Sequence, residues 1–92
     1  MIKLHLREPI EDRKEFVGYV SQILNMGNPE PYMTSKGDTS RWSIDPEGNN
    51  FWIKFCEENP RNFTISCRYD YQSGYLLSIA LVLVNRFDCS VI

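Results

Sequence analysis

The side chains best placed for chemistry in this chain are four carboxylates near its N-terminus. They recur every three or four residues, the spacing that stacks side chains on one face of a helix. The four are Glu8, Glu11, Asp12 and Glu15. As a helical stripe they would cover about 10 Å, a length over which duplex DNA presents about six phosphates. The stripe therefore predicts a surface that binds a basic partner.

Acidic residues in two later turns are expected to extend this surface. They are Asp45, Glu47, Glu57 and Glu58. A twofold dimer would double the array and bring its charge closer to that of a nucleic acid. The competing interpretation is that the stripe is the solvated side of an amphipathic helix, which needs no partner.

Residues suited to catalysis or metal binding are few. The one histidine, His5, has no serine or cysteine nucleophile near it in the sequence. Glu57 and Glu58 border a turn and resemble a solvated rim more than a general acid and base, which need unlike surroundings. The cysteines, expected to be free thiols without metal-ligand spacing, are Cys56, Cys67 and Cys89. We expect no enzyme activity, no metal and no cofactor.

A second candidate surface is the outer face of the predicted sheet, which combines positive charge with one tryptophan. Its residues are Lys3, His5, Arg7, Trp52, Lys54, Thr64, Ser66 and Arg68. Such mixtures bind single-stranded nucleic acid through phosphate contacts and stacking. The sequence lacks the basic-aromatic motif of an RNA-recognition sheet, so nucleic-acid binding stands second to protein binding.

These side chains must be positioned by a single domain of residues 1–92. Residues 2–7 alternate apolar and polar, which predicts a strand. A helix is expected from Pro9 to Asn25, where its apolar face would carry Phe16, Val17, Val20, Ile23 and Leu24. Residues 26–40 show no period and predict a long loop around Tyr32 and Met33.

Three further strands are predicted around two turns at residues 45–48 and 59–62. They span 41–44, 51–56 and 63–69, and their alternation predicts one inward face for each. The inward residues are Ile2, Leu4 and Leu6 in the first strand, and Phe51, Ile53, Phe55, Phe63, Ile65, Cys67 and Tyr69 in the later ones. Two hairpins in series make a meander.

The last predicted element is a helix from Gly74 to Phe87 that is apolar on most sides. Such breadth places it at the centre of the core or in a dimer interface, and a buried strand at 79–84 is the alternative. The candidate interface residues are Tyr75, Leu77, Leu81 and Val84. The helix is shorter than the roughly twenty residues that span a bilayer, so no membrane partner is expected. Residues 89–92 have the outline of a prenylation box and are interpreted as a frayed tail.

The expected fold is α+β, with the order β-α-β-β-β-α and two helices packed on one face of an antiparallel sheet. Twelve acidic and ten basic residues give a formal charge of −2, which excludes neither a basic nor an acidic partner. No basic segment followed by an apolar run opens the chain, so we expect no signal peptide and a cytoplasmic protein.

Asparagine-rich turns, the acidic stripe and the length of 92 residues together carry a resemblance. The turns are Gly48-Asn49-Asn50 and Glu58-Asn59-Pro60-Arg61-Asn62. The chain resembles the small early proteins of T-even phages, and among them it is most similar to the Arn-type anti-restriction proteins. The resemblance implies a dimeric DNA mimic that blocks a host restriction nuclease acting on modified cytosine.

The sequence therefore predicts a non-enzymatic inhibitor that presents carboxylates to a basic, DNA-binding surface of a host protein such as a restriction nuclease. A toxin-neutralising immunity protein would use the same physics with a different partner. A nucleic-acid-binding sheet is the second hypothesis, and the immunity protein is the third.

Overall fold

The computed structural model describes residues 1–32 and 41–92. The elements of these residues are β1 (Ile2–Leu6), α1 (Arg13–Leu24), β2 (Glu30–Tyr32), β3 (Arg41–Ser43), β4 (Phe51–Phe55), β5 (Asn62–Cys67), the 3₁₀ turn η1 (Asp70–Gln72), α2 (Ser73–Arg86) and β6 (Cys89–Val91).

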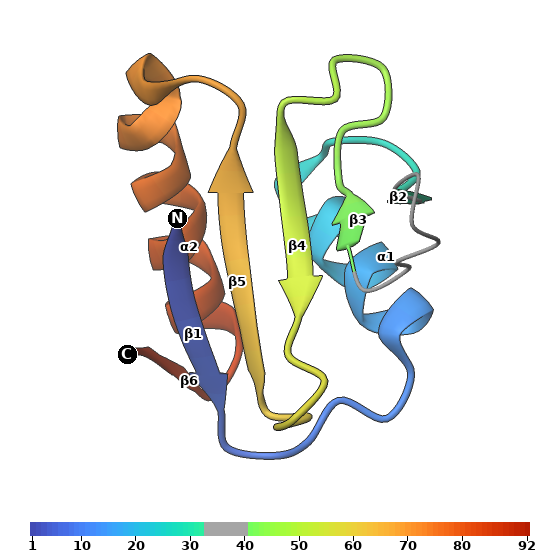
Figure 1. Ribbon diagram of the computed structural model, residues 1–92, viewed down its shortest axis with the longest axis vertical. Helices are drawn as coiled ribbons and strands as arrows, with labels where there is room; N and C mark the ends of the chain where they lie inside the picture. Colours follow the sequence, from blue (N-terminus) through green and yellow to red (C-terminus); the bar gives the residue numbers. More distant parts are fainter. Residues whose placement is uncertain (33–40) are drawn as a thin grey trace.

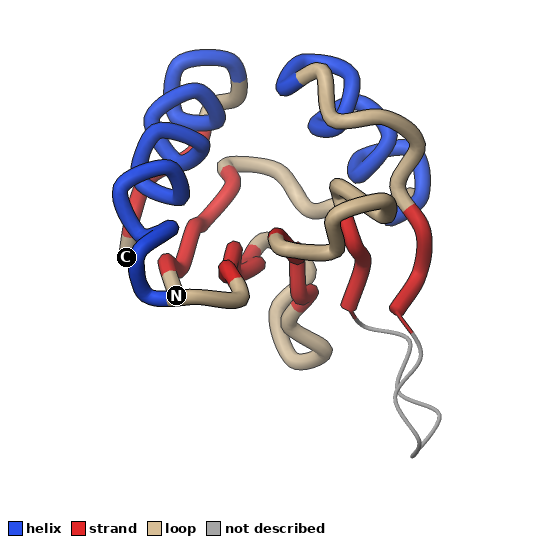
Figure 2. The backbone as a smooth tube through the Cα atoms, turned by 90° about the horizontal axis from the view of Figure 1, so that it is seen from above, coloured by secondary structure: helices blue, strands red, loops and turns tan. Residues whose placement is uncertain are grey.

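All six strands join one sheet in the order β2-β3-β4-β5-β1-β6, with every neighbouring pair antiparallel (Figure 1). Both helices cover the same face of this sheet (Figure 2). The opposite face carries no helix from the described part of the chain. The predicted α+β architecture, with two helices on one face of an antiparallel sheet, is confirmed.

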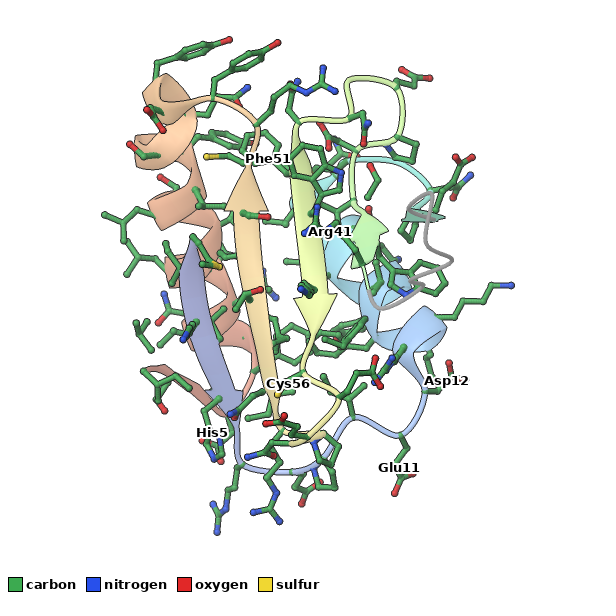
Figure 3. The ribbon with its side chains drawn as sticks, in the orientation of Figure 1. His5, Glu11, Asp12, Arg41, Phe51 and Cys56 are labelled. Atoms are coloured by element: carbon green, nitrogen blue, oxygen red, sulfur yellow. The ribbon has the colours of Figure 1, made fainter. Side chains whose placement is uncertain are left out.

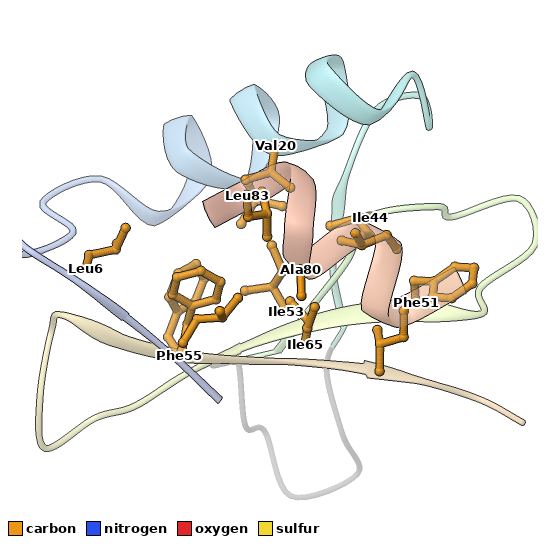
Figure 4. Close-up of a cluster of buried hydrophobic side chains, with 14 residues drawn as sticks. Leu6, Val20, Ile44, Phe51, Ile53, Phe55, Ile65, Ala80 and Leu83 are labelled. Atoms are coloured by element: carbon orange, nitrogen blue, oxygen red, sulfur yellow. The ribbon is translucent and has the colours of Figure 1, made fainter. Parts of the chain in front are cut away.

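The core lies between the helices and the sheet (Figure 4). Alternation along the strands sends every second side chain to the helix side, as in β4, where Ile53 and Phe55 are buried and Lys54 is exposed. Antiparallel register then places Ile53 opposite Ile65 and Phe55 opposite Phe63. The helices close the core with Val17, Val20, Leu76, Ile79, Ala80 and Leu83.

Helix α1 begins at Arg13, not at Pro9 as the sequence indicated. Asp12 has an extended backbone (φ −124°, ψ 105°), and its carboxylate accepts a hydrogen bond of 3.1 Å from the Glu15 amide. This makes Asp12 the N-cap, and the helix starts after it. The first two members of the predicted acidic stripe lie in the preceding loop, so the prediction of a helical stripe is wrong.

The end of α1 was predicted to within one residue. Asn25 takes a left-handed conformation (φ 56°, ψ 44°), and its amide donates to the carbonyls of Gln22 and Ser21. An αL residue that satisfies the last carbonyls is a common helix terminator.

The segment predicted as one long loop contains a short strand. β2 pairs with β3, and Pro31 lies opposite Trp42. Proline is tolerated here because β2 is an edge strand and needs no ladder bond on its open side. The loop prediction is therefore wrong for residues 30–32, while Met33 and the rest of the predicted loop to residue 40 lie outside the described residues.

Helix α2 confirms the predicted C-terminal helix to within one residue at each end and rules out a strand at 79–84. Its buried residues recur every three or four positions and face the sheet: Leu76, Ile79, Ala80 and Leu83. Strand β5 ends at Cys67, so Tyr69 does not share its inward face and is instead exposed before η1. None of the described helices is long and apolar enough to cross a membrane.

The tail is a strand, contrary to expectation. β6 pairs with β1, placing Val91 opposite Leu4, and the amide of Ile92 donates to the Lys3 carbonyl at 3.0 Å. The tail is ordered because β1, the first strand of the chain, has β5 on one side and accepts a partner on the other. Three residues give too short a pattern for such a strand to be recognised from sequence.

Candidate partner-binding groove

A wide groove of about 990 Å³ opens beside the start of α1. It is formed by the end of β1, the loop from residue 7 to residue 12, the first turns of α1 and the link between α2 and β6. Its lining residues are Leu6, Arg7, Glu8, Pro9, Ile10, Glu11, Asp12, Glu15, Phe16, Tyr19, Phe87 and Asp88. We call this the acidic groove.

All four carboxylates of the predicted stripe line the acidic groove. Glu8, Glu11, Asp12 and Glu15 line it together with Asp88, and Arg7 is its one basic residue. The lining therefore carries a formal charge of −4 from five carboxylates and one guanidinium. Glu11 and Asp12 point away from the sheet beside the start of α1 (Figure 3). The stripe is absent as a helical feature, but its residues share one surface.

Backbone hydrogen bonds fix the loop that carries the rim. The Arg7 amide donates to the Asp88 carbonyl at 3.0 Å, and the Ile10 amide donates to the Pro60 carbonyl at 2.9 Å. Ile10 also packs against the core. Because this loop is held at Arg7 and at Ile10, the carboxylates are positioned before any partner arrives, which lowers the entropic cost of binding.

The floor of the acidic groove is aromatic and joins the two helices. The Phe16 and Phe87 ring centroids are 5.4 Å apart, and Tyr19 meets Phe87 edge-on at 5.6 Å. Tyr19 is 55% exposed. Aromatic faces accept the aliphatic stems and cationic heads of lysine and arginine, so floor and rim favour the same kind of ligand.

Two of the rim carboxylates already have partners. Asp12 caps α1, and Asp88 pairs with Arg7 at 3.3 Å through side chains that are 80% (Arg7) and 75% (Asp88) exposed. This ion pair contributes little to stability, because solvent screens side chains that are so exposed. Glu8, Glu11 and Glu15 line the groove without a side-chain hydrogen bond or ion pair to any other described residue.

The acidic residues of the later turns do not join this surface. Asp45 is a structural residue, because its carboxylate accepts hydrogen bonds from the Asn50 and Phe51 amides in the turn before β4. Glu57 is bound by Arg13 through two contacts of 3.0 and 3.2 Å. The prediction of one continuous acidic face is therefore wrong: the residues outside the groove lining are Asp45, Glu47, Glu57 and Glu58.

Tyr19, Phe87 and Asp88 line the groove, although the sequence did not predict that they would join the acidic residues. Tyr19 lies in the middle of α1, and the other two follow α2 at the far end of the chain. No local pattern links positions so distant in sequence. The apolar content of the final helix was the one indication in the sequence. It predicts that the helix is buried, but not that Phe87 lies at the margin of the core beside the groove.

The predicted dimer-interface residues divide between two flanks of α2. Leu77 and Leu81 are 54% and 57% exposed, and the 100° step of a helix places Val84 beside them. Tyr75 lies on the other flank, where its ring packs on Phe51 at a centroid distance of 5.1 Å. Tyr75 is thus separated from the other three candidates.

The residues considered for catalysis are dispersed. His5 Nδ1 donates a hydrogen bond to Asn62 Oδ1 on the sheet face opposite the helices. The cysteines are free, and burial, helped by the neighbouring charge of Asp88, raises the pKa of the Cys89 thiol above its usual value. The described residues contain no group of three or more histidine, cysteine or acidic side chains placed to hold a metal ion.

Comparison with protein families, with curated proteins and with solved structures finds no match to this chain.

Proposed function

We propose that the protein is a non-enzymatic inhibitor that takes a basic segment of a partner protein into the acidic groove. The observation that carries the proposal is the convergence of five carboxylates around an aromatic floor. A lysine- or arginine-bearing segment would place its charged heads on the rim and its aliphatic stems on Tyr19 and Phe87.

A basic segment of this kind is typical of DNA-binding surfaces, which neutralise phosphates with lysine and arginine. The resemblance to anti-restriction proteins of T-even phages gives the proposal a specific partner, a host restriction nuclease acting on modified cytosine. A toxin recognised through the same groove is the alternative partner, and would make this an immunity protein.

The test is the cleavage of modified-cytosine DNA by such a nuclease in the presence of the protein. We expect inhibition that weakens steeply with added salt, because exposed charges are screened beyond about 10 Å at 0.1 M salt. Glu11→Lys with Glu15→Lys reverses two charges of the groove and should abolish inhibition.

The matched control is Glu47→Lys with Glu58→Lys, which changes the net charge by the same amount at exposed positions outside the groove. We expect this variant to inhibit like the wild type. Full inhibition by the groove variant, or equal loss in both variants, would contradict a role for the acidic groove. No inhibition by the wild-type protein would reject the nuclease as its partner.

A further inference from the structure

The sheet face opposite the helices, here called the open face, is positively charged. The strand register assigns its residues, because side chains directly opposite each other in paired strands share a face. They are Glu30, Ser43, Trp52 and Ser66 in one row, Arg41, Lys54, Thr64 and Lys3 in the next, and Asn62, His5 and Ser90 in the third. Figure 3 looks onto this face, with Arg41 and His5 labelled.

Three cations lie in the middle row. Arg41 is directly opposite Lys54, and Thr64 separates Lys54 from Lys3. The row crosses three strand spacings, about 14 Å. The two ion pairs found in the described residues use Arg7 and Arg13, not these three. Glu30, at the edge of the sheet, is the one carboxylate that the register places on the open face.

Like charges directly opposite each other destabilise a sheet. Lysine on an edge strand is often explained as protection against aggregation, but β4 is an interior strand. The repulsion between Lys54 and Arg41 therefore lowers the stability of the sheet, and protection of an edge strand against aggregation does not explain why both cations are there. A polyanion lying across the row would remove the repulsion.

A hollow of about 300 Å³ lies between the two lysines of the row. Its polar lining residues include Lys3, Lys54, Thr64 and Asn62, and the rest of the lining is Met1, Phe55, Cys56, Phe63 and Ile92. Two lysines, a threonine hydroxyl and an asparagine amide that line one hollow suit a phosphate, since all four side chains can donate hydrogen bonds. Trp52 lies two residues from Lys54 on the same face, about 7 Å along the strand.

We propose that the open face binds single-stranded nucleic acid. The middle row contacts successive phosphates, the hollow holds one of them, and Trp52 supplies an aromatic surface beside the track. A sheet of six strands is about 24 Å wide, too wide to enter a major groove about 12 Å wide, so this face is not shaped to read the bases of a duplex. This surface is independent of the acidic groove.

The test is the fluorescence anisotropy of a labelled oligothymidine of about twelve nucleotides, within the range of single-strand site sizes. With three phosphate contacts, the logarithm of the binding constant should fall with the logarithm of salt at a slope of about −2. Lys3→Glu with Lys54→Glu should weaken binding at least about tenfold, because two of the three contacts become repulsive.

The matched control is Lys14→Glu with Arg86→Glu, an equal change of net charge on exposed helix positions away from the open face. Its affinity for the oligonucleotide should lie within about twofold of the wild-type affinity. The groove variant, Glu11→Lys with Glu15→Lys, should also bind within about twofold, because the two surfaces are separate. Absence of binding, equal loss in both lysine and control variants, stronger binding to the matching duplex, or binding of thymidine monophosphate alone would each overturn the proposal. Circular dichroism confirms that each variant is folded.

Discussion

Single carboxylates of this protein differ in what they do, although the sequence presents them alike. Asp12 and Asp45 accept backbone hydrogen bonds that shape a helix start and a turn. Glu11 and Glu15 make no side-chain contact of that kind and face the acidic groove. The first pair is needed for stability and the second is available for binding, so substitutions should separate the two properties.

Asp12→Ala tests the structural role. Loss of an N-cap typically lowers the free energy of unfolding by about 1 kcal/mol, and urea denaturation should show this change. Glu11→Ala, one residue earlier in the loop, should leave the midpoint unchanged. Equal effects of the two substitutions would show that Asp12 does not act as a cap.

Cys89 offers a test of local electrostatics. Because its pKa is raised by burial and by Asp88, less thiolate exists at a given pH than for an ordinary cysteine. Alkylation by iodoacetamide at pH 8, followed by mass spectrometry, should therefore be slower at Cys89 than for a free cysteine. Asp88→Asn removes the charge and should speed the reaction, whereas an unchanged rate would exclude that electrostatic contribution.

The raised pKa also predicts the direction of a pH effect on stability. The thiol form is favoured in the folded state, so this contribution is present below the unfolded pKa and is lost as pH rises through the folded one. Stability should fall in the alkaline range, and Cys89→Ser should reduce that fall.

At the scale of elements, the long periodic segments were predictable and the short ones were not. The alternation of β4 and β5 and the apolar spacing of α2 depend on burial against one core, which the sequence records directly. The start of α1 depends on Asp12 capping and on a loop bond from Ile10 to Pro60, and the latter is a tertiary contact. β2 and β6 are three residues each, too short for a period to show.

The residues of the open face were likewise predictable only in part. Alternation alone placed Lys3, His5, Trp52 and Lys54 on one sheet face, and the strand register confirms this. Arg41 joined them only when the register of β3 was known. Arg7 follows β1 and lines the acidic groove, whereas Arg68 follows β5, where its amide donates to the Asn50 carbonyl at 2.8 Å.

The two faces of helix α2 differ in burial, so substitutions on them should differ in their effect on stability. Leu83 is fully buried and Leu81 is 57% exposed. Leu83→Ala should lower the free energy of unfolding by about 2–5 kcal/mol, since it leaves a cavity in the core. Leu81→Ala should cost well under about 1 kcal/mol in the same denaturation experiment. Comparable losses would contradict the orientation of this helix.

For the whole molecule, the net charge of −2 conceals a separation of charge. The acidic groove carries −4 in its lining, while the open face carries three cations in a single row. The sequence total alone excluded neither a basic nor an acidic partner. The fold shows that the two signs are sorted onto different surfaces, each of which has a field of its own.

We propose that a second copy of the chain packs against the flank of α2 that carries Leu77, Leu81 and Val84. Leu77 and Leu81 lie there, and Val91, which is 58% exposed, faces the helix side of the sheet at its β6 edge. Leu77→Lys with Leu81→Lys should convert a wild-type dimer into a folded monomer, as measured by light scattering. A wild-type protein that is monomeric at its highest soluble concentration would contradict the dimer.

The most direct test of the account is the calorimetric titration of an arginine-rich peptide with leucines between the basic residues. The arginines of such a peptide supply cations for the rim of the acidic groove, and their aliphatic stems and the leucine side chains supply apolar surface for its floor. We predict binding to the wild type and to Glu47→Lys with Glu58→Lys, and a loss of at least about 1.4 kcal/mol, or tenfold, in Glu11→Lys with Glu15→Lys. Equal affinity of all three proteins would contradict the claim that this groove is the binding site.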